Sequence, residues 1–345
     1  MIIKTKNPEY ACILTTGRTG SDYLQSCLDS VPGILTMTGQ TYFKKFFIQS
    51  NFENIKHSKK KVIDQFVKIY QNLFKKDMLE NKKINLDTRK FKEIFLIHSE
   101  NKNLEKKNFI ELIFLSFEIL TRNKYSQVKT VVNHCHSVEE MVFFLDIFPS
   151  AKILVTIRNP IQNLFSGINN WKKFSKIDLG QKHNYFYTKR ILYDLRYALK
   201  LNNRVHYVKL ENCFKKQQKK NLLRFLNVKY STIANKATCN GKPWIGDRLS
   251  QNRTTDGSFN VKVLEKSNEY YFNAKDEFVL SYFYKTYQKF GYFNKKKGSF
   301  YHMIKYFFSA ISPLSFEKKT IMEQPFKLKN YYYYLQRVLL FIIEL

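Results

Sequence analysis

The order of apolar and polar positions along the chain predicts alternating strands and helices. Apolar runs with the length and β-branched content of buried strands lie at 10–16, 129–133, 151–157 and 203–210. Segments with helical spacing or helix-start residues follow each of them, at 20–30, after Ser137, from Pro160 and at 218–226. This alternation favours an α/β fold with a central parallel sheet.

Two regions depart from that alternation. Residues 42–125 are mostly helical in pattern; Val62, Phe66, Ile69 and Leu73, for example, are spaced four, three and four apart. After about residue 298 the chain becomes aromatic, basic and apolar. We therefore predict an α/β domain at 1–298 with a helical insert at about 40–125, and a helical extension at 299–345. That extension could pack on the core, mediate self-association or lie on a membrane surface.

Net charge is the feature of the composition that bears most on the possible partners of the protein. The 345 residues include 59 Lys and Arg against 28 Asp and Glu, a formal net charge of +31. Such a charge favours anionic partners: nucleotides, acidic glycans, nucleic acid or an anionic membrane. The lysines are scattered in pairs and triplets, however, which also suits a solvated surface. We do not expect a dedicated nucleic-acid binder.

Cysteine usage and the N-terminal sequence bear on location. The five cysteines form no C-x-x-C pair, which indicates buried, reduced thiols. The first residues, MIIKTKNPEY, lack the apolar core of a signal peptide, and no run of 18 apolar residues occurs. These features predict a cytoplasmic protein, with peripheral membrane attachment as an open possibility.

The first candidate site lies between the first strand and the first helix. Glycine, hydroxyl and guanidinium groups gather there in the order Gly17, Arg18, Thr19, Gly20, Ser21. Backbone N–H groups at such a helix N-terminus bind anions. The string is not a Walker A loop, which requires G-x-x-x-x-G-K-[ST].

A second candidate anion site follows the strand at 151–157. Arg158 stands at the end of that strand, and Ser166 comes eight positions later, in the helix that Pro160 opens. Ligands bind at the carboxyl ends of parallel strands, and arginine suits phosphate. Two anion sites at two strand–helix junctions match a nucleotide with phosphates at both ends of its ribose.

Here the chain resembles the sulfotransferases that use 3′-phosphoadenylyl sulfate (PAPS). The resemblance rests on GRTGSDYL, on KILVTIRNPIQNLFSGINNW and on VHYVKLENCFKKQQKKNLLRFLNV, in that order, and covers roughly residues 10–35, 130–171 and 204–228. It implies a three-layer α/β/α fold with a central parallel sheet and the topology of P-loop NTPases. It also implies PAPS as co-substrate and no metal.

The resemblance also implies roles for individual residues. Arg18 and the backbone of Thr19, Gly20 and Ser21 would hold the 5′-phosphate, with Arg18 stabilising the departing oxygen. Arg158 and Ser166 match the family's 3′-phosphate motif. A later loop, NGKPWIGDRLSQN, is similar to the family's closing loop and offers Lys242 and Arg248 for a phosphate and Trp244 for stacking; a surface turn with a half-buried tryptophan is the alternative.

An acceptor hydroxyl needs a general base, and histidine is the commonest choice. His134 and His136 follow the strand at 129–133, and either could be that base. Structural histidines bonded to backbone are the main alternative. The two histidines could also bind a metal ion, but the sequence shows no evident third ligand. Glu100 is a fallback candidate for the base.

Together these features predict a sulfotransferase that moves a sulfuryl group from PAPS to a hydroxyl or amine, in which positioning and charge neutralisation dominate. The helical insert suggests an acceptor such as a glycan or a lipid-linked sugar. The alternatives are a nucleotide-dependent kinase or other phosphotransferase, and a non-enzymatic binder of anionic membrane or nucleic acid.

Overall fold

The computed structural model describes residues 8–37, 39, 41–75, 85–121, 128–175, 180–246, 256–265, 272–293 and 300–344, with the backbone alone at 171–175, 202 and 265. The chain divides into two compact units. The first comprises described residues within Met1–Thr15, Gly20–Thr156 and Leu201–Val261. The second comprises those within Thr16–Thr19, Ile157–Lys200 and Lys262–Leu345.

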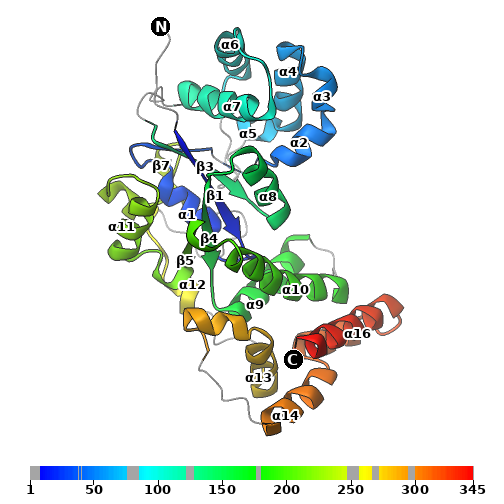
Figure 1. Cartoon of the computed structure of the whole chain (residues 1–345). Helices are drawn as coiled ribbons and strands as arrows, with labels where there is room; N and C mark the ends of the chain where they lie inside the picture. The colour runs from blue at the N-terminus through cyan, green and yellow to red at the C-terminus, as the bar shows by residue number, and fades with distance from the viewer. Residues whose placement is uncertain are drawn as a thin grey trace. The chain divides into compact units, whose positions relative to one another are not determined.

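The first unit contains the sheet and the helical insert (Figure 1). Its strands are β1 (Glu9–Thr15), β2 (Ile34–Thr36), β3 (Thr130–Cys135), β4 (Lys152–Ile157, whose last residue belongs to the second unit), β5 (Val205–Lys209), β6 (Thr238–Cys239) and β7 (Lys242–Pro243). Its helices are α1 (Ser21–Leu28), α2 (Phe43–Gln49), α3 (Phe52–Ile55), α4 (Lys59–Ile69), α5 (Gln71–Lys75), α6 (Thr88–Ser99), α7 (Lys106–Thr121), α8 (Val138–Ile147) and α11 (Lys216–Phe225), with 3₁₀ turns at Asn202–Arg204, Leu210–Asn212 and Thr232–Asn235.

The five-stranded sheet has the order β2-β3-β1-β4-β5. β1 is central and pairs in parallel with β3 on one side and β4 on the other, so that Ile13 lies opposite both His134 and Leu154. Residues 11–14 of β1 are fully buried, as expected of a strand covered on both faces. Since β1, β3 and β4 are parallel, their carboxyl ends share one edge of the sheet, where such folds bind ligands.

The aromatic residues of the insert form much of its core. Phe46 stacks on Phe109 with ring centroids 4.9 Å apart, and Phe52 and Phe66 meet the same Phe109 ring edge-on or tilted. All four rings are at most 1% exposed. Aromatic pairs of this kind add to the free energy of area burial, so the abundance of phenylalanine has a packing role in this part of the chain.

The second unit is helical in its described residues. Its helices are α9 (Pro160–Ser175), α10 (Gly180–Leu199), α12 (Lys262–Glu265), α13 (Ala274–Phe283), α14 (Phe300–Ile311), α15 (Ser315–Glu323) and α16 (Leu328–Ile343), with a 3₁₀ turn at Lys285–Phe290. A buried ion pair joins α16 to α15: Arg337 Nη2 lies 2.5 Å from Glu317 Oε2, and both side chains are at most 1% exposed. Gln181 of α10 also donates to Glu317.

These observations confirm the expected α/β class with a central parallel sheet and the helical nature of the 42–125 region. The predicted strand at 203–210 is shorter, because 3₁₀ turns flank β5 on both sides. All five cysteines are buried and carry free thiols. Among the helices in the described part of the chain, none combines the length and apolar character needed to cross a membrane.

Candidate active site

The loop after β1 is held by two side chains from α9 and α10. The backbone N–H of Arg18 donates to Asn163 Oδ1 at 2.7 Å and to Tyr187 Oη at 2.8 Å. Tyr187 in turn donates to Asn163 Oδ1, and Asn163 Nδ2 donates to the carbonyl of Thr16. Asn163 is fully buried and Tyr187 nearly so. The shape of the loop is therefore set by interior hydrogen bonds before any ligand binds.

Glycine permits this close approach. Gly17 has φ +111°, and a Cβ added there would lie 2.5 Å from Tyr187 Oη and 2.7 Å from Asn163 Oδ1. Gly167 of α9 likewise leaves room for the Tyr187 ring, because a Cβ added at Gly167 would lie 2.1 Å from Tyr187 Cε1. Burial raises the pKa of the Tyr187 hydroxyl, against the opposing effect of the Arg18 charge, so the phenol stays protonated and can donate.

The loop leads directly into α1. Its N-cap is Gly20, in the left-handed conformation with φ 79°, and no side chain among the described residues caps the helix there. Thr19 and Ser21 on either side are buried. A helix N-terminus capped by glycine exposes partial positive charge from its first backbone N–H groups, which is what the predicted 5′-phosphate site requires.

Arg158 stands directly after β4 and is only 7% exposed. Its Nη2 donates to the carbonyl of Val263 at 3.0 Å, and its Nε to Gln162 at 3.4 Å. Asn159 caps α9 by accepting from the backbone N–H of Ile161. These two contacts help to orient the guanidinium at the end of β4.

Ser166 lies in the second turn of α9 and is partly exposed. Its hydroxyl accepts from Asn170 Nδ2 at 3.2 Å. Pro160 begins α9, as predicted.

His134 and His136 lie side by side at the end of β3, with ring centroids 4.4 Å apart. His134 Nδ1 is 2.9 Å from Gln25 Oε1, while the Gln25 amide nitrogen donates to the carbonyl of Met37. Because the amide nitrogen is the donor, Oε1 must accept from the imidazole, which assigns the His134 proton to Nδ1. Its Nε2 therefore carries a lone pair, and it has no hydrogen-bond partner among the described residues.

Burial lowers the pKa of His134 to about 3, so the ring is neutral at physiological pH, and the same burial makes it a weaker base than an exposed imidazole. Asp22 Oδ1 lies 3.6 Å from His134 Nδ1. Asp22, His134 and His136 bring their ligating atoms within 4.8 Å of one another, a set that could also hold a metal ion. Asp22 is the third group that sequence reasoning did not find.

The later loop is only partly described. Lys242 is exposed on β7, and Trp244 is buried, with its ring 6.0 Å from that of Tyr23. Arg248 lies outside the described residues. Glu100, the fallback base, is exposed at the C-terminal end of α6.

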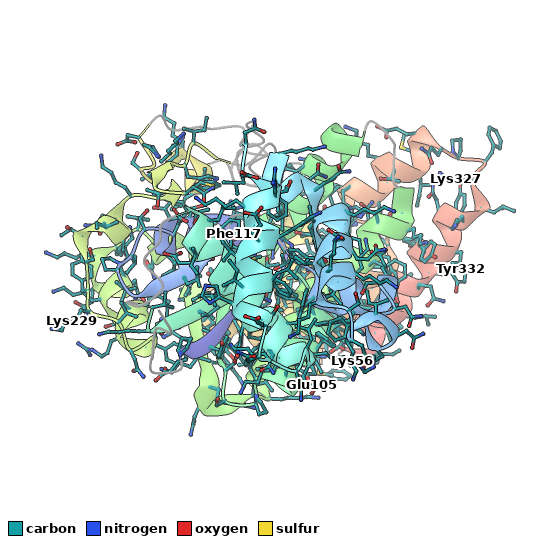
Figure 2. The ribbon with its side chains drawn as sticks, turned by 90° about the horizontal axis from the view of Figure 1, so that it is seen from above. Lys56, Glu105, Phe117, Lys229, Lys327 and Tyr332 are labelled. Carbon is teal, nitrogen blue, oxygen red and sulfur yellow. The ribbon has the colours of Figure 1, made fainter. Side chains whose placement is uncertain are left out.

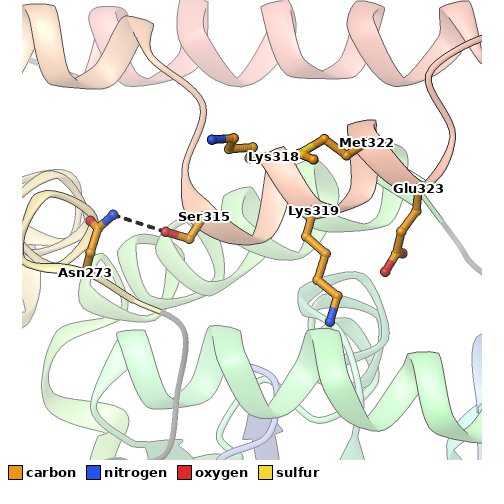
Figure 3. Close-up of a pocket in the computed structure, with 6 residues that line it drawn as sticks. All are labelled: Asn273, Ser315, Lys318, Lys319, Met322 and Glu323. Atoms are coloured by element: carbon orange, nitrogen blue, oxygen red, sulfur yellow. Dashed lines mark hydrogen bonds between the residues drawn. The ribbon is translucent and has the colours of Figure 1, made fainter.

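An open pocket of about 530 Å³ lies beside α15 in the second unit (Figure 3). Its walls are Asn273, Ser315, Lys318, Lys319, Met322 and Glu323. None of the site residues predicted from the sequence lines it, so the pocket adds nothing to the candidate active site.

Sequence reasoning missed Asn163, Tyr187 and Gln25. Asn163 follows Arg158 by five residues and could have been noticed as a polar residue on the inner side of α9. No local sequence pattern identifies Tyr187 or Gln25 as a functional residue. Their partners lie 169 and 109 residues away, respectively.

The fold and this loop define a class: an α/β protein with a central parallel sheet and a glycine-containing loop between its first strand and first helix. Comparison with known sequences narrows the class, because the profile of the sulfotransferase family matches residues 11–236. The chain belongs to the sulfotransferase family and is a transferase. No curated protein matches the sequence.

Two of the solved structures that are similar to the chain are sulfotransferase domains. The sulfotransferase domain of the Synechococcus PCC 7002 olefin synthase has a TM-score of 0.50 at 14% identity, covering 84% of this chain and 98% of that domain. The sulfotransferase domain from the curacin biosynthetic pathway has a TM-score of 0.46 at 13% identity, covering 76% of this chain and 91% of that domain. The first of these likenesses supports the fold assignment.

Proposed function

We propose that the protein transfers a sulfuryl group from PAPS to a hydroxyl, or an amine, of an acceptor molecule. The observation that carries the proposal is the loop Gly17–Thr19, whose Arg18 N–H is bonded to Asn163 and Tyr187 in a chain of the sulfotransferase family. A loop held in one shape before the ligand arrives avoids the ordering cost of binding. That arrangement suits the 5′-phosphosulfate of PAPS.

In this proposal each of the two anion sites binds one end of the donor nucleotide. Arg18 and the backbone of Thr19, Gly20 and Ser21 hold the 5′-phosphosulfate, and Arg158 with Ser166 holds the 3′-phosphate. The burial of Arg158 strengthens its attraction for a phosphate, because charges interact more strongly away from bulk water. Lys242, Trp244 and Arg248 are assigned to the same nucleotide from the resemblance alone.

Transfer requires a proton acceptor. The acceptor hydroxyl loses its proton to an imidazole nitrogen, its oxygen bonds to sulfur, and the bond from sulfur to the bridging phosphate oxygen breaks. Arg18 balances the negative charge that develops on that leaving oxygen. The base is His134 or His136. His134 has its Nδ1 proton directed to Gln25, so its Nε2 can take the proton. No step requires a metal ion.

The acceptor is proposed to be a glycan or a lipid-linked sugar. The support is the insert α2–α7, which adds a separate helical layer with its own aromatic core. A small phenol would not need so large an addition. A panel of glycan, lipid-linked and phenolic acceptors with labelled PAPS tests this choice, and turnover confined to phenols would overturn it.

Binding of 3′,5′-ADP tests the donor assignment. The purified protein is titrated with 3′,5′-ADP, ATP–Mg²⁺ and heparin at moderate salt. We expect micromolar binding of 3′,5′-ADP that Arg158→Ala weakens at least about tenfold, as expected for the loss of a buried charged partner. Arg89→Ala is the matched control, because it removes the same charge from an exposed helix position.

Three outcomes would contradict the donor assignment. Preference for ATP–Mg²⁺ with no response to 3′,5′-ADP would indicate a phosphotransferase. Salt-sensitive binding to heparin alone would indicate a non-enzymatic binder of polyanions. Equal effects of Arg158→Ala and Arg89→Ala would remove Arg158 from the site.

The base is tested separately by turnover. His134→Ala and His136→Ala are compared at saturating PAPS, with 3′,5′-ADP affinity as the check on folding. Loss of turnover with retained affinity in one variant identifies the base. Full turnover in both variants would refute the assignment to this pair.

A further inference from the structure

The C-terminal helices expose an unusual amount of apolar surface. Among the described residues, 21 large hydrophobic side chains are exposed, and 15 of them lie between Phe300 and Ile343. Scattered exposed hydrophobics are normal in a folded protein, whereas a concentration of them marks an interaction surface.

On α16 the exposed side chains form a continuous row. They are Leu328, Tyr332, Leu335, Leu339 and Ile343, spaced four, three, four and four residues apart, and each is more than half exposed. At the rise of an α-helix the row is about 22 Å long. The opposite side of the same helix is buried and carries Asn330, Arg337, Val338 and Phe341. Because every residue of this row is more than half exposed, no described residue of the unit covers the row.

α14 has the same two-sided character. Tyr306 and Ala310 are fully buried against the unit, while Phe300, Ile304 and Phe308 are exposed four residues apart along the other side. The exposed apolar row is thus a shared property of two helices that pack on one another.

The charges around these rows are overwhelmingly positive. Lysines are exposed at 305, 318, 319, 327 and 329. Of the acidic residues of this region, Glu317 is buried in its pair with Arg337, and Glu344 is paired with Arg196. Glu323 is the one acidic side chain exposed on α14–α16.

Lysine and apolar side chains even alternate where α16 begins. Phe326, Lys327, Leu328 and Lys329 are all exposed, Phe326 almost completely. Figure 2 labels Lys327 and Tyr332 on this stretch, with their side chains pointing outward. Apolar side chains with flanking lysines, and tyrosines beside them, are the composition that binds the interface of an anionic bilayer.

We infer that α14 and α16 dock on an anionic membrane surface, with the α16 row in the boundary between headgroups and acyl chains. The lysines would contact the phosphates of the headgroups, each adding to the attraction. A second copy of the chain fits less well as the occupant, because each copy has a formal net charge of +31 and would present the same lysines. This inference concerns where the enzyme works and does not rest on the identity of the donor.

Flotation of the full chain with vesicles tests the inference. Vesicles of phosphatidylcholine alone are compared with vesicles containing 40% phosphatidylserine, and variant folding is checked by circular dichroism and thermal midpoint. We expect binding to the anionic vesicles and little to the neutral ones. Leu335→Glu with Leu339→Glu should weaken that binding at least about tenfold. The matched control, Ile48→Glu with Ile97→Glu, changes two apolar residues elsewhere that are at least as exposed, and it should leave binding unchanged.

A second variant separates charge from apolar burial. Lys327→Glu with Lys329→Glu keeps the apolar row and should weaken binding to anionic vesicles at least about tenfold. The inference is overturned if the wild-type chain does not float with anionic vesicles, or if both control and test variants lose binding equally. It is also overturned if the wild type is a dimer by light scattering that Leu335→Glu with Leu339→Glu dissociates, because the row would then be a contact between copies.

Discussion

Replacing Gly17 by alanine tests whether the loop after β1 is shaped by its contacts with Asn163 and Tyr187. The new Cβ would lie 2.5 Å from Tyr187 Oη and 2.7 Å from Asn163 Oδ1, on a backbone at φ +111°. A non-glycine residue in such a conformation costs about 1–3 kcal/mol. Loss of the hydrogen bonds made by the Arg18 N–H adds about 1 kcal/mol.

The sum, about 2–4 kcal/mol, corresponds to roughly 30- to 700-fold in an equilibrium constant. The loop can escape the strain by moving away from Asn163 and Tyr187, so most of the cost should appear in ligand binding, which needs the native loop. Calorimetric titration with 3′,5′-ADP measures it. We expect affinity to fall by at least about tenfold with only a small change in thermal midpoint.

Two comparisons make the result decisive. Gly241→Ala places alanine at φ +76°, but its Cβ would meet nothing closer than Ser30 Oγ at 4.0 Å, so its thermal midpoint reports backbone strain alone. Combining Gly17→Ala with Tyr187→Phe removes the 2.5 Å contact with the hydroxyl and should restore part of the affinity. Affinity of Gly17→Ala equal to that of the wild type would refute the reasoning.

Three further changes follow from the same contacts. Tyr187→Phe keeps the ring against the helix but removes the hydroxyl that accepts the Arg18 N–H; 3′,5′-ADP should bind about 5- to 10-fold more weakly by calorimetry, and unchanged binding would exclude a role for the hydroxyl. His134 has a folded pKa of about 3, below the ordinary value. The unfolded chain therefore binds more protons between these pKa values, and stability should fall as the pH drops below about 6.5, by about 2 kcal/mol at pH 5. Urea unfolding at pH 7 and pH 5 should show a larger loss in the wild type than in His134→Asn, by about 2 kcal/mol, because His183 and His206, whose pKa values burial also lowers, contribute equally to both; an equal loss in both would contradict it. Arg337→Ala leaves Glu317 buried without its cation and should lower the free energy of unfolding by about 3–5 kcal/mol in urea; a loss below about 1 kcal/mol would show that the pair is not buried in solution.

The predicted sheet and the predicted loops came from patterns that are local in the sequence. The run at 151–157 predicts β4 within one residue, and Pro160 marks the first residue of α9. Burial on both faces selects continuous apolar strands, and proline is tolerated only in the first turn of a helix. Such rules act between neighbouring residues, so they can be read without knowing the fold.

The partners of those residues could not be read in the same way. Whether His134 serves as a proton acceptor depends on Gln25, which assigns its tautomer, and Gln25 is 109 residues away. The C-terminal extension was recognisable from the sequence as aromatic, basic and apolar, but composition cannot say which face of a helix is covered. Only packing decides that.

The loop that carries the proposed donor site shows the same contrast between local sequence patterns and long-range contacts. Its composition and its place between strand and helix, with a second arginine after β4, were enough to predict an anion site and a sulfotransferase-like chain. The bonds from Arg18 to Asn163 and Tyr187 span 145 and 169 residues, respectively, and arise only when α9 and α10 pack beside the loop. Local propensity depends on near neighbours, whereas the hydrogen bonds that position this loop depend on segments that meet only in the folded chain.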